Sequence, residues 1–150
     1  MIMDTYVTHP HADSDGIVRD GNLRRTFFRM KVEGASDSEI LHSFYILYND
    51  RFFRSQLPRI PLEVVEGETD FHGRFHWETE NGALTELKLL LRWDQFMGYE
   101  WFRETLLHEM CHVWVRCIEG DVSIEQDPHG EAWSRKASEM GLRLIGDPPR

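Results

Sequence analysis

The sequence predicts an α+β fold in which a small antiparallel or mixed sheet packs on one helix that carries a metal-binding motif. Three observations lead to this prediction. Alternating aromatic and polar residues before Asn81-Gly82 predict a β-hairpin. Apolar residues at three- and four-residue steps predict a long, mostly buried helix over roughly residues 99–118. The pentapeptide 108–112 lies within that helix and reads His-Glu-Met-Cys-His.

The length of 150 residues, with 41% hydrophobic and 12% aromatic content, suits one domain with one core. We place this domain at residues 23–146. Residues 1–22 mix Asp, Gly, Pro and His without periodicity and are expected to form a flexible N-terminal arm, in which His9 and His11 receive no role. Residues 147–150 are expected to form a C-terminal tail.

No run approaches the ~18 apolar residues of a membrane span. The first residues also lack the basic start and the apolar region of a signal peptide. We therefore expect a cytoplasmic protein that makes no membrane contact.

The first part of the domain is expected to contain a strand and a helix. Residues 25–32 hold β-favouring residues in partial alternation, which predicts a short strand before the turn at Gly34. The sequence Ser-Asp-Ser-Glu at residues 36–39 matches a capping box and predicts the start of an amphipathic helix that ends before Pro58. His42 lies off the apolar series of this helix and is interpreted as a surface or packing residue.

Three strands are predicted next. Residues 61–66 form the first, and residues 71–78 form the second, with aromatic residues facing inward. The third, residues 84–92, keeps three alternate leucines on one face. His72 and His76 share the polar face of the second strand, which we interpret as a solvated sheet face.

The spacing of the pentapeptide suits a zinc site. At about 100° per residue, His108 and His112 stand about 40° apart on the helix, and Glu109 lies about 60° beyond His112. Two imidazoles can then hold one Zn²⁺ from successive turns, while the carboxylate reaches the fourth, water-filled position. Burying these groups on a core helix would be costly without a partner. The motif therefore predicts one bound zinc ion.

A third protein ligand must come from downstream. The extended motif with Gly and His three and six residues after the second His is excluded, because Val115 and Ile118 occupy those positions. Glu125, Glu131 and His129 remain. His129 is the best candidate, because imidazole is a good zinc donor at neutral pH.

The two cysteines, Cys111 and Cys117, are expected to be reduced core residues. They are six residues apart on one helix and point about 120° from each other, so they cannot form a disulfide there. Three protein ligands and a water complete a tetrahedral zinc site, so Cys111 is not assigned as a ligand.

The residues after the long helix are expected to return the chain to the motif. Gly120 and the acidic stretch to Pro128 break the helix and form a loop that brings His129 back. A short helix follows and is capped near Gly141. Trp133 on this helix is expected to pack in the core and to fix the angle at which His129 approaches the metal. Residues 142–145 are expected to form a short terminal strand.

Two motifs together give a family resemblance. His-Glu-Met-x-His at residues 108–112 is followed by His129, Gly130 and an aromatic residue, Trp133. Over roughly residues 36–142 the chain resembles the SprT-like zinc metallopeptidases, the family that includes the Spartan proteases.

The resemblance implies a zincin-like metallopeptidase fold and a complete set of site residues. His108, His112 and His129 would bind zinc, and Glu109 would be the catalytic acid and base. The implied activity is that of a zinc-dependent endopeptidase with protein substrates, including DNA-associated or DNA-crosslinked proteins.

The composition gives little support to a DNA partner. The formal net charge is −9, and no set of four cysteines suggests the zinc ribbon that family members often carry after this domain. A local cluster of Arg19, Arg24, Arg25, Arg29 and Lys31 is interpreted as a solvated basic strand. Two alternatives remain open. One is a SprT-like peptidase without a DNA link, acting as a regulatory or effector protease. The other is a non-catalytic, zinc-stabilised binding module.

Overall fold

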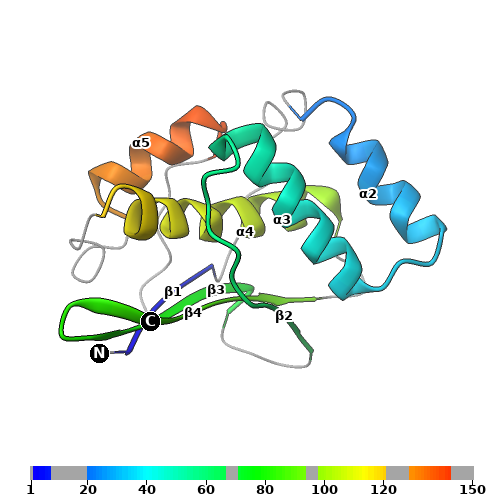
Figure 1. The fold of residues 1–150 in the computed structure, drawn as a ribbon. Helices are drawn as coiled ribbons and strands as arrows, with labels where there is room; N and C mark the ends of the chain where they lie inside the picture. The colour runs from blue at the N-terminus through cyan, green and yellow to red at the C-terminus, as the bar shows by residue number, and fades with distance from the viewer. Residues whose placement is uncertain (1, 8–19, 67–70, 94–97, 121–128, 143–150) are drawn as a thin grey trace.

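The computed structural model describes residues 2–7, 20–66, 71–93, 98–120 and 129–142 of the chain. These residues form one mixed sheet with the helices gathered on one of its faces (Figure 1). In chain order the elements are β1 (Ile2–Val7), α2 (Leu23–Val32), α3 (Asp37–Phe53), β2 (Leu62–Val65), β3 (Gly73–Glu80), β4 (Ala83–Arg92), α4 (Tyr99–Val113), the π-helix η1 (Trp114–Ile118) and α5 (Glu131–Glu139). The predicted α+β class is confirmed.

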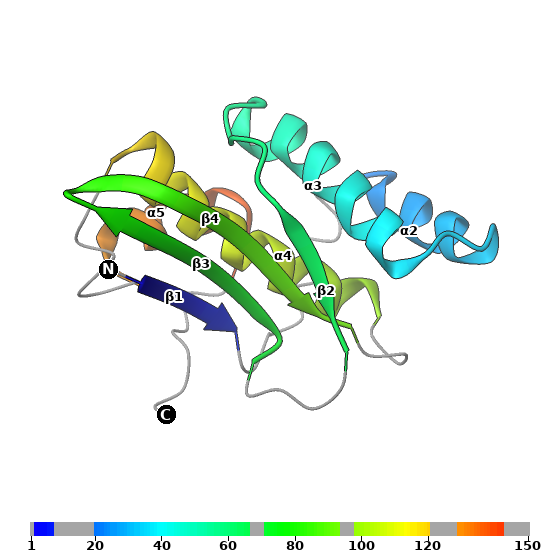
Figure 2. The same ribbon diagram turned by 60° about the horizontal axis from the view of Figure 1, so that its bottom comes forward.

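The sheet has the strand order β1-β3-β4-β2, which can be followed in Figure 2. β3 pairs antiparallel with both β1 and β4, whereas β2 pairs parallel with β4. The predicted hairpin is confirmed: Glu80 pairs with Ala83, and Asn81 and Gly82 both have positive φ, 53° and 80°. Two such residues make the tight turn whose twist matches that of the flanking strands.

The prediction of a flexible arm is wrong for residues 2–7. This segment is strand β1, and its pairing with β3 runs from Ile2 opposite Glu78 to Val7 opposite Gly73. The N–H and C=O groups on that edge of β3 need hydrogen-bond partners, and residues distant in sequence supply them. The local sequence of residues 2–7 therefore did not predict the strand. His9 and His11 lie outside the described residues. Of the strand expected at residues 142–145, the structure describes only Leu142.

The predicted strand at residues 25–32 is also wrong, because this segment belongs to helix α2. Leu23, Phe27 and Met30 recur at helical spacing, and all three pack in or against the core. The Phe27 ring lies 5.0 Å from the ring of Phe102 on α4 and 5.9 Å from that of Phe44 on α3, measured between centroids. In a helix, these three apolar residues lie on one face and are buried together. The free energy gained by that burial outweighs the β propensity of single residues.

The start of α3 is a capping box, as predicted. Ser36 Oγ accepts a hydrogen bond from the Glu39 N–H, and the Glu39 carboxylate accepts one from the Ser36 N–H, each at 3.1 Å. These two bonds satisfy N–H groups that the first turn of a helix leaves without partners. His42 is exposed on this helix, which agrees with its interpretation as a surface residue.

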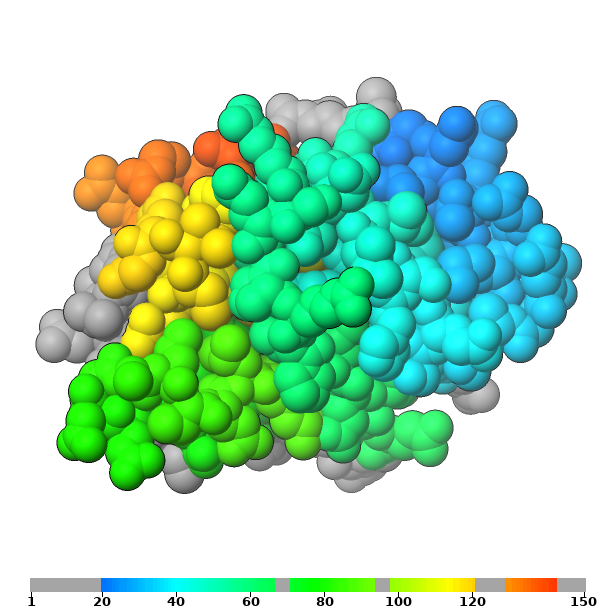
Figure 3. Space-filling model, in the orientation of Figure 1, coloured from blue at the N-terminus to red at the C-terminus, as the bar shows by residue number. Residues whose placement is uncertain are grey.

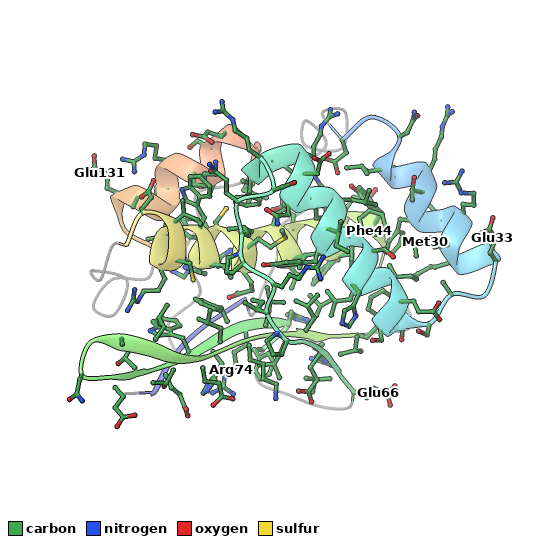
Figure 4. All side chains as sticks on the ribbon, in the orientation of Figure 1. Met30, Glu33, Phe44, Glu66, Arg74 and Glu131 are labelled. Carbon is green, nitrogen blue, oxygen red and sulfur yellow. The ribbon has the colours of Figure 1, made fainter. Side chains whose placement is uncertain are left out.

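The core lies between the sheet and the helices, and α4 runs through it. Every residue of α4 from Phe102 to Val113 is buried. Phe44 points from α3 toward α4 in Figure 4, and its ring meets that of Phe102 edge-on at 5.3 Å. In Figure 3, α3 and the segment after it cover the middle of α4 on this side of the molecule. The polar residues of α4 from Arg103 onward are therefore held inside the protein.

A buried polar network ties the start of α4 to the end of α5. Arg103 Nε donates to Asp20 Oδ2 at 2.7 Å, and Arg103 Nη2 donates to the Met140 carbonyl at 2.8 Å. Tyr99 also donates its hydroxyl hydrogen to Asp20. Burial raises the pKa of Asp20, while the Arg103 charge opposes that rise. The network thus fixes how α5 lies along α4.

Asp20→Ala is expected to lower the free energy of unfolding by about 3–5 kcal/mol, because it leaves the buried Arg103 charge without its partner. Urea unfolding followed by tryptophan fluorescence measures this loss. Glu63→Gln is the matched control, because it breaks the exposed Glu63–Lys88 pair and should cost under about 1 kcal/mol. Equal losses in the two variants would contradict the role of the network.

Among the described residues, no helix has the length and apolar character needed to cross a membrane.

Candidate metal centre

Three histidine rings meet where α4 and the start of α5 come together. His108 and His112 stand on successive turns of α4 and are buried, and His129 lies two residues before α5. The His129 Nε2 atom is 2.9 Å from His108 Nε2 and 3.2 Å from His112 Nε2. A ligand atom from each of the three residues lies within 4.8 Å of the other two.

This arrangement fits a metal ion better than a set of hydrogen bonds. A neutral imidazole nitrogen carries either one hydrogen or one lone pair. His129 Nε2 therefore cannot form a full hydrogen bond with both His108 Nε2 and His112 Nε2. A tetrahedral zinc ion with Zn–N bonds of about 2.0–2.1 Å holds its donor atoms about 3.3 Å apart, close to the separations observed here. A cation between the rings would accept all three lone pairs.

Burial keeps the donors in the form that a metal needs. It lowers the pKa of both His108 and His112 well below the usual value for histidine, and the neighbouring His129 lowers both further. Both imidazoles of α4 are therefore neutral at pH 7. Neutral imidazole is the metal-binding form of histidine.

Trp133 on α5 packs against all three histidines. Its ring centroid lies 4.7 Å from that of His108, 5.6 Å from that of His112 and 4.8 Å from that of His129. Its indole N–H donates to the His108 carbonyl at 3.2 Å. The prediction that Trp133 belongs to the core is confirmed. These contacts join α5 to α4 at the point where the histidines meet.

Glu109 is fully buried on α4, beside His108, and the backbone of β3 lies against it. A Cβ atom on Gly73 would lie 2.7 Å from Thr105 Cγ2 and 3.1 Å from Glu109 Cγ. Only glycine fits at this contact, and the strand limits where the Glu109 side chain can lie. In the sequence, Gly73 stands between Phe71 and Phe75 on the inward-facing side of the strand predicted at residues 71–78. A glycine at an inward-facing strand position is the signal that could have revealed the close approach.

The other ligand candidates that the structure describes do not join the group. Glu131 is exposed at the first residue of α5, and Glu125 lies outside the described residues. Cys111 is buried with its Sγ 3.7 Å from Met140 Sδ, and Cys117 is partly buried. Both cysteines are free, as expected. Among the candidates that the structure describes, His129 is the residue that the fold brings to His108 and His112.

The two histidines of the second predicted strand have different surroundings. His76 lies in β3, close to Glu78 and to Glu86 of β4. Arg74, two residues earlier on β3, points to the side of the sheet away from the helices (Figure 4). His72 precedes β3, and its ring contacts that of Trp101 on α4 at 5.6 Å. The interpretation as a solvated sheet face is therefore wrong for His72.

The mixed α+β fold and the three-histidine group define a domain with a candidate metal site. A model of the SprT-like family matches residues 41–144. The chain therefore belongs to the SprT-like family, as its motifs suggested. Searches of curated proteins and of solved structures gave no match. The matched region begins within α3, so β1 and α2 precede it.

His129→Ala is expected to reduce the zinc content of the purified protein as strongly as His108→Ala does, because each removes one of three donors. Elemental analysis of the protein after dialysis measures the zinc content. His42→Ala, on the exposed face of α3, is the matched control and should keep full occupancy. Full occupancy in His129→Ala would move the third ligand to Glu125 or Glu131.

Trp133→Phe is expected to weaken zinc binding about tenfold, because it keeps a ring beside the histidines but removes the N–H donor to the His108 carbonyl. Competition with a chromophoric chelator measures the dissociation constant. Trp114→Phe is the matched control, because the Trp114 N–H donates to Glu119 at 3.2 Å instead. An equal change in both variants would show that loss of any indole donor has this effect.

Proposed function

We propose that this protein is a zincin-like, zinc-dependent endopeptidase, with His108, His112 and His129 as zinc ligands and Glu109 as general base and acid. The observation that carries the proposal is the convergence of three ring nitrogens from α4 and the turn before α5, at 2.9 and 3.2 Å around His129 Nε2. Membership of the SprT-like family supports a protease-type domain, which agrees with this proposal.

The donor set determines the chemistry that a zinc ion would supply. Held by three imidazoles, zinc would keep its double positive charge, which would polarise a carbonyl group and lower the pKa of bound water toward about 7. His108, His112 and His129 would hold this charge. They contribute no negative charge that would weaken it.

Glu109 carries the proton in this mechanism. It stands beside His108 on α4, on the side of the helix that faces Gly73. Its carboxylate takes the proton from the attacking water and returns it to the nitrogen of the departing amine, so one group acts first as base and then as acid. No covalent bond forms between protein and substrate. The close approach of Gly73 limits the positions that the Glu109 side chain can take.

The main alternative is a binding module in which zinc has a structural role. Structural zinc sites are normally closed by four protein ligands, whereas catalytic sites use three and leave one position open. Three histidines come together among the described residues, and Glu109 follows His108 on α4. This arrangement favours catalysis.

The substrates proposed are proteins, and the family resemblance includes proteins bound or crosslinked to DNA. The formal net charge of −9 favours a peptidase that acts without DNA, because phosphate contacts need clustered Lys and Arg. Cleavage of an unfolded protein, measured with and without single- and double-stranded DNA, distinguishes the two. Stimulation by DNA would support the DNA-linked substrates.

Glu109→Gln is expected to keep full zinc content and to lower the rate of casein cleavage by about 10²–10⁴, because the ligands remain and the proton carrier is lost. Zinc content and cleavage rate are measured on the same preparation. Glu100→Gln, a partly exposed position on the same helix, is the matched control and should cleave at the parent rate. Hydrolysis near the parent rate in Glu109→Gln would refute the assignment. Zinc binding by the parent protein without cleavage of any unfolded protein would support the binding module.

A further inference from the structure

Trp101 is an exposed aromatic residue on the helix that carries the metal ligands. It is 43% exposed, although every residue from Phe102 to Val113 is buried. Seven residues separate Trp101 from His108, and at about 100° per residue the two side chains leave α4 within about 20° of each other. Trp101 therefore shares the helix face of the metal centre, two turns closer to the start of α4.

The start of β3 runs beside this face of α4. His72 contacts the Trp101 ring, and the next residue, Gly73, packs against Thr105 and Glu109. In Figure 2 the strands β3 and β4 run lengthwise along α4. An extended peptide aligned with the sheet would therefore also run along α4. It would pass Trp101 and the three histidines in turn.

The distance along the helix corresponds to a definite number of substrate residues. At a rise of about 1.5 Å per residue, Trp101 and His108 are about 10 Å apart along the axis of α4. An extended peptide advances about 3.3 Å per residue. A peptide whose scissile bond lies at the histidines therefore has the side chain of about its third residue at Trp101.

The contact with His72 makes this position suitable for recognition. The His72 ring meets the indole at 5.6 Å and 70°, an edge-to-face arrangement that supports one side of the Trp101 ring. An indole held in this way presents a large apolar surface at little cost in side-chain entropy. Tryptophan in such settings commonly anchors aromatic and large apolar groups of a partner.

We propose that Trp101 and His72 form a substrate subsite that selects an aromatic or large apolar side chain about three residues from the scissile bond. This inference rests on the proposed endopeptidase function and names the sequence preference of that same site. Phe28 on α2 is exposed to a similar extent, 39%, but lies outside the family-matched region and away from the metal ligands. It therefore supplies the control.

The test uses peptides copied from a casein segment that the parent enzyme cleaves. Each peptide carries Phe, Leu, Ala or Asp at the third residue on one side of the cleaved bond, and both sides are examined. The parent is expected to cleave the Phe peptide about tenfold faster than the Ala peptide, as kcat/KM, at one of the two positions. Trp101→Ala should bring this ratio close to one. Trp101→Phe should restore most of it, and Phe28→Ala should leave it at the parent value.

Peptide binding to zinc-loaded Glu109→Gln separates failure of the subsite from failure of the proposed function. If the parent cleaves neither casein nor any peptide, the binding test uses unstructured peptides that differ only by Phe or Ala at one residue. If this variant then prefers the Phe peptide and the preference disappears when Trp101→Ala is added, the subsite stands and the proposed hydrolysis is overturned. If the parent cleaves the peptides and shows no Phe preference at either position, the subsite is overturned. A preference that Trp101→Ala leaves unchanged overturns it equally.

Discussion

The burial of polar groups on one core helix is the constraint on which the rest of this structure depends. His108, Glu109 and His112 all lie in the buried part of α4, where polar atoms without partners destabilise a protein. The approach of His129 gives the two imidazoles of α4 a shared centre, and the separations there suit a tetrahedral metal ion. If an ion does bind, the free energy of folding and the affinity for the metal are linked through this one face of α4.

The position of α5 follows from the same constraint. One end of α5 is joined to α4 through Trp133, whose N–H donates to the His108 carbonyl. The other end is joined through the Met140 carbonyl, which accepts from Arg103. Asp20 completes this second connection and links the segment before α2 to the helix pair. The two connections lie at opposite ends of α5, so they fix its direction and hold the segment that carries His129.

The agreement between sequence and structure is closest where the determinants are local. The capping box at Ser36 and the tight turn at Asn81-Gly82 depend on neighbouring residues and appear as predicted. The helical period around His108 also lies within a single element. The two errors in secondary structure, at β1 and α2, concern segments with weak local patterns. Pairing with β3 decided the first, and packing of Phe27 against Phe102 decided the second.

The sequence by itself determined that two histidines and a glutamate share one helix face, because a helix places residues one turn apart on the same side. It also limited the third ligand to a few downstream residues. Only the tertiary structure decided that His129 meets that pair, that Gly73 packs against Glu109 and that Asp20 joins Arg103. Each of these contacts joins residues distant along the chain. Their formation depends on how the sheet, α4 and α5 pack together, which local spacing does not encode.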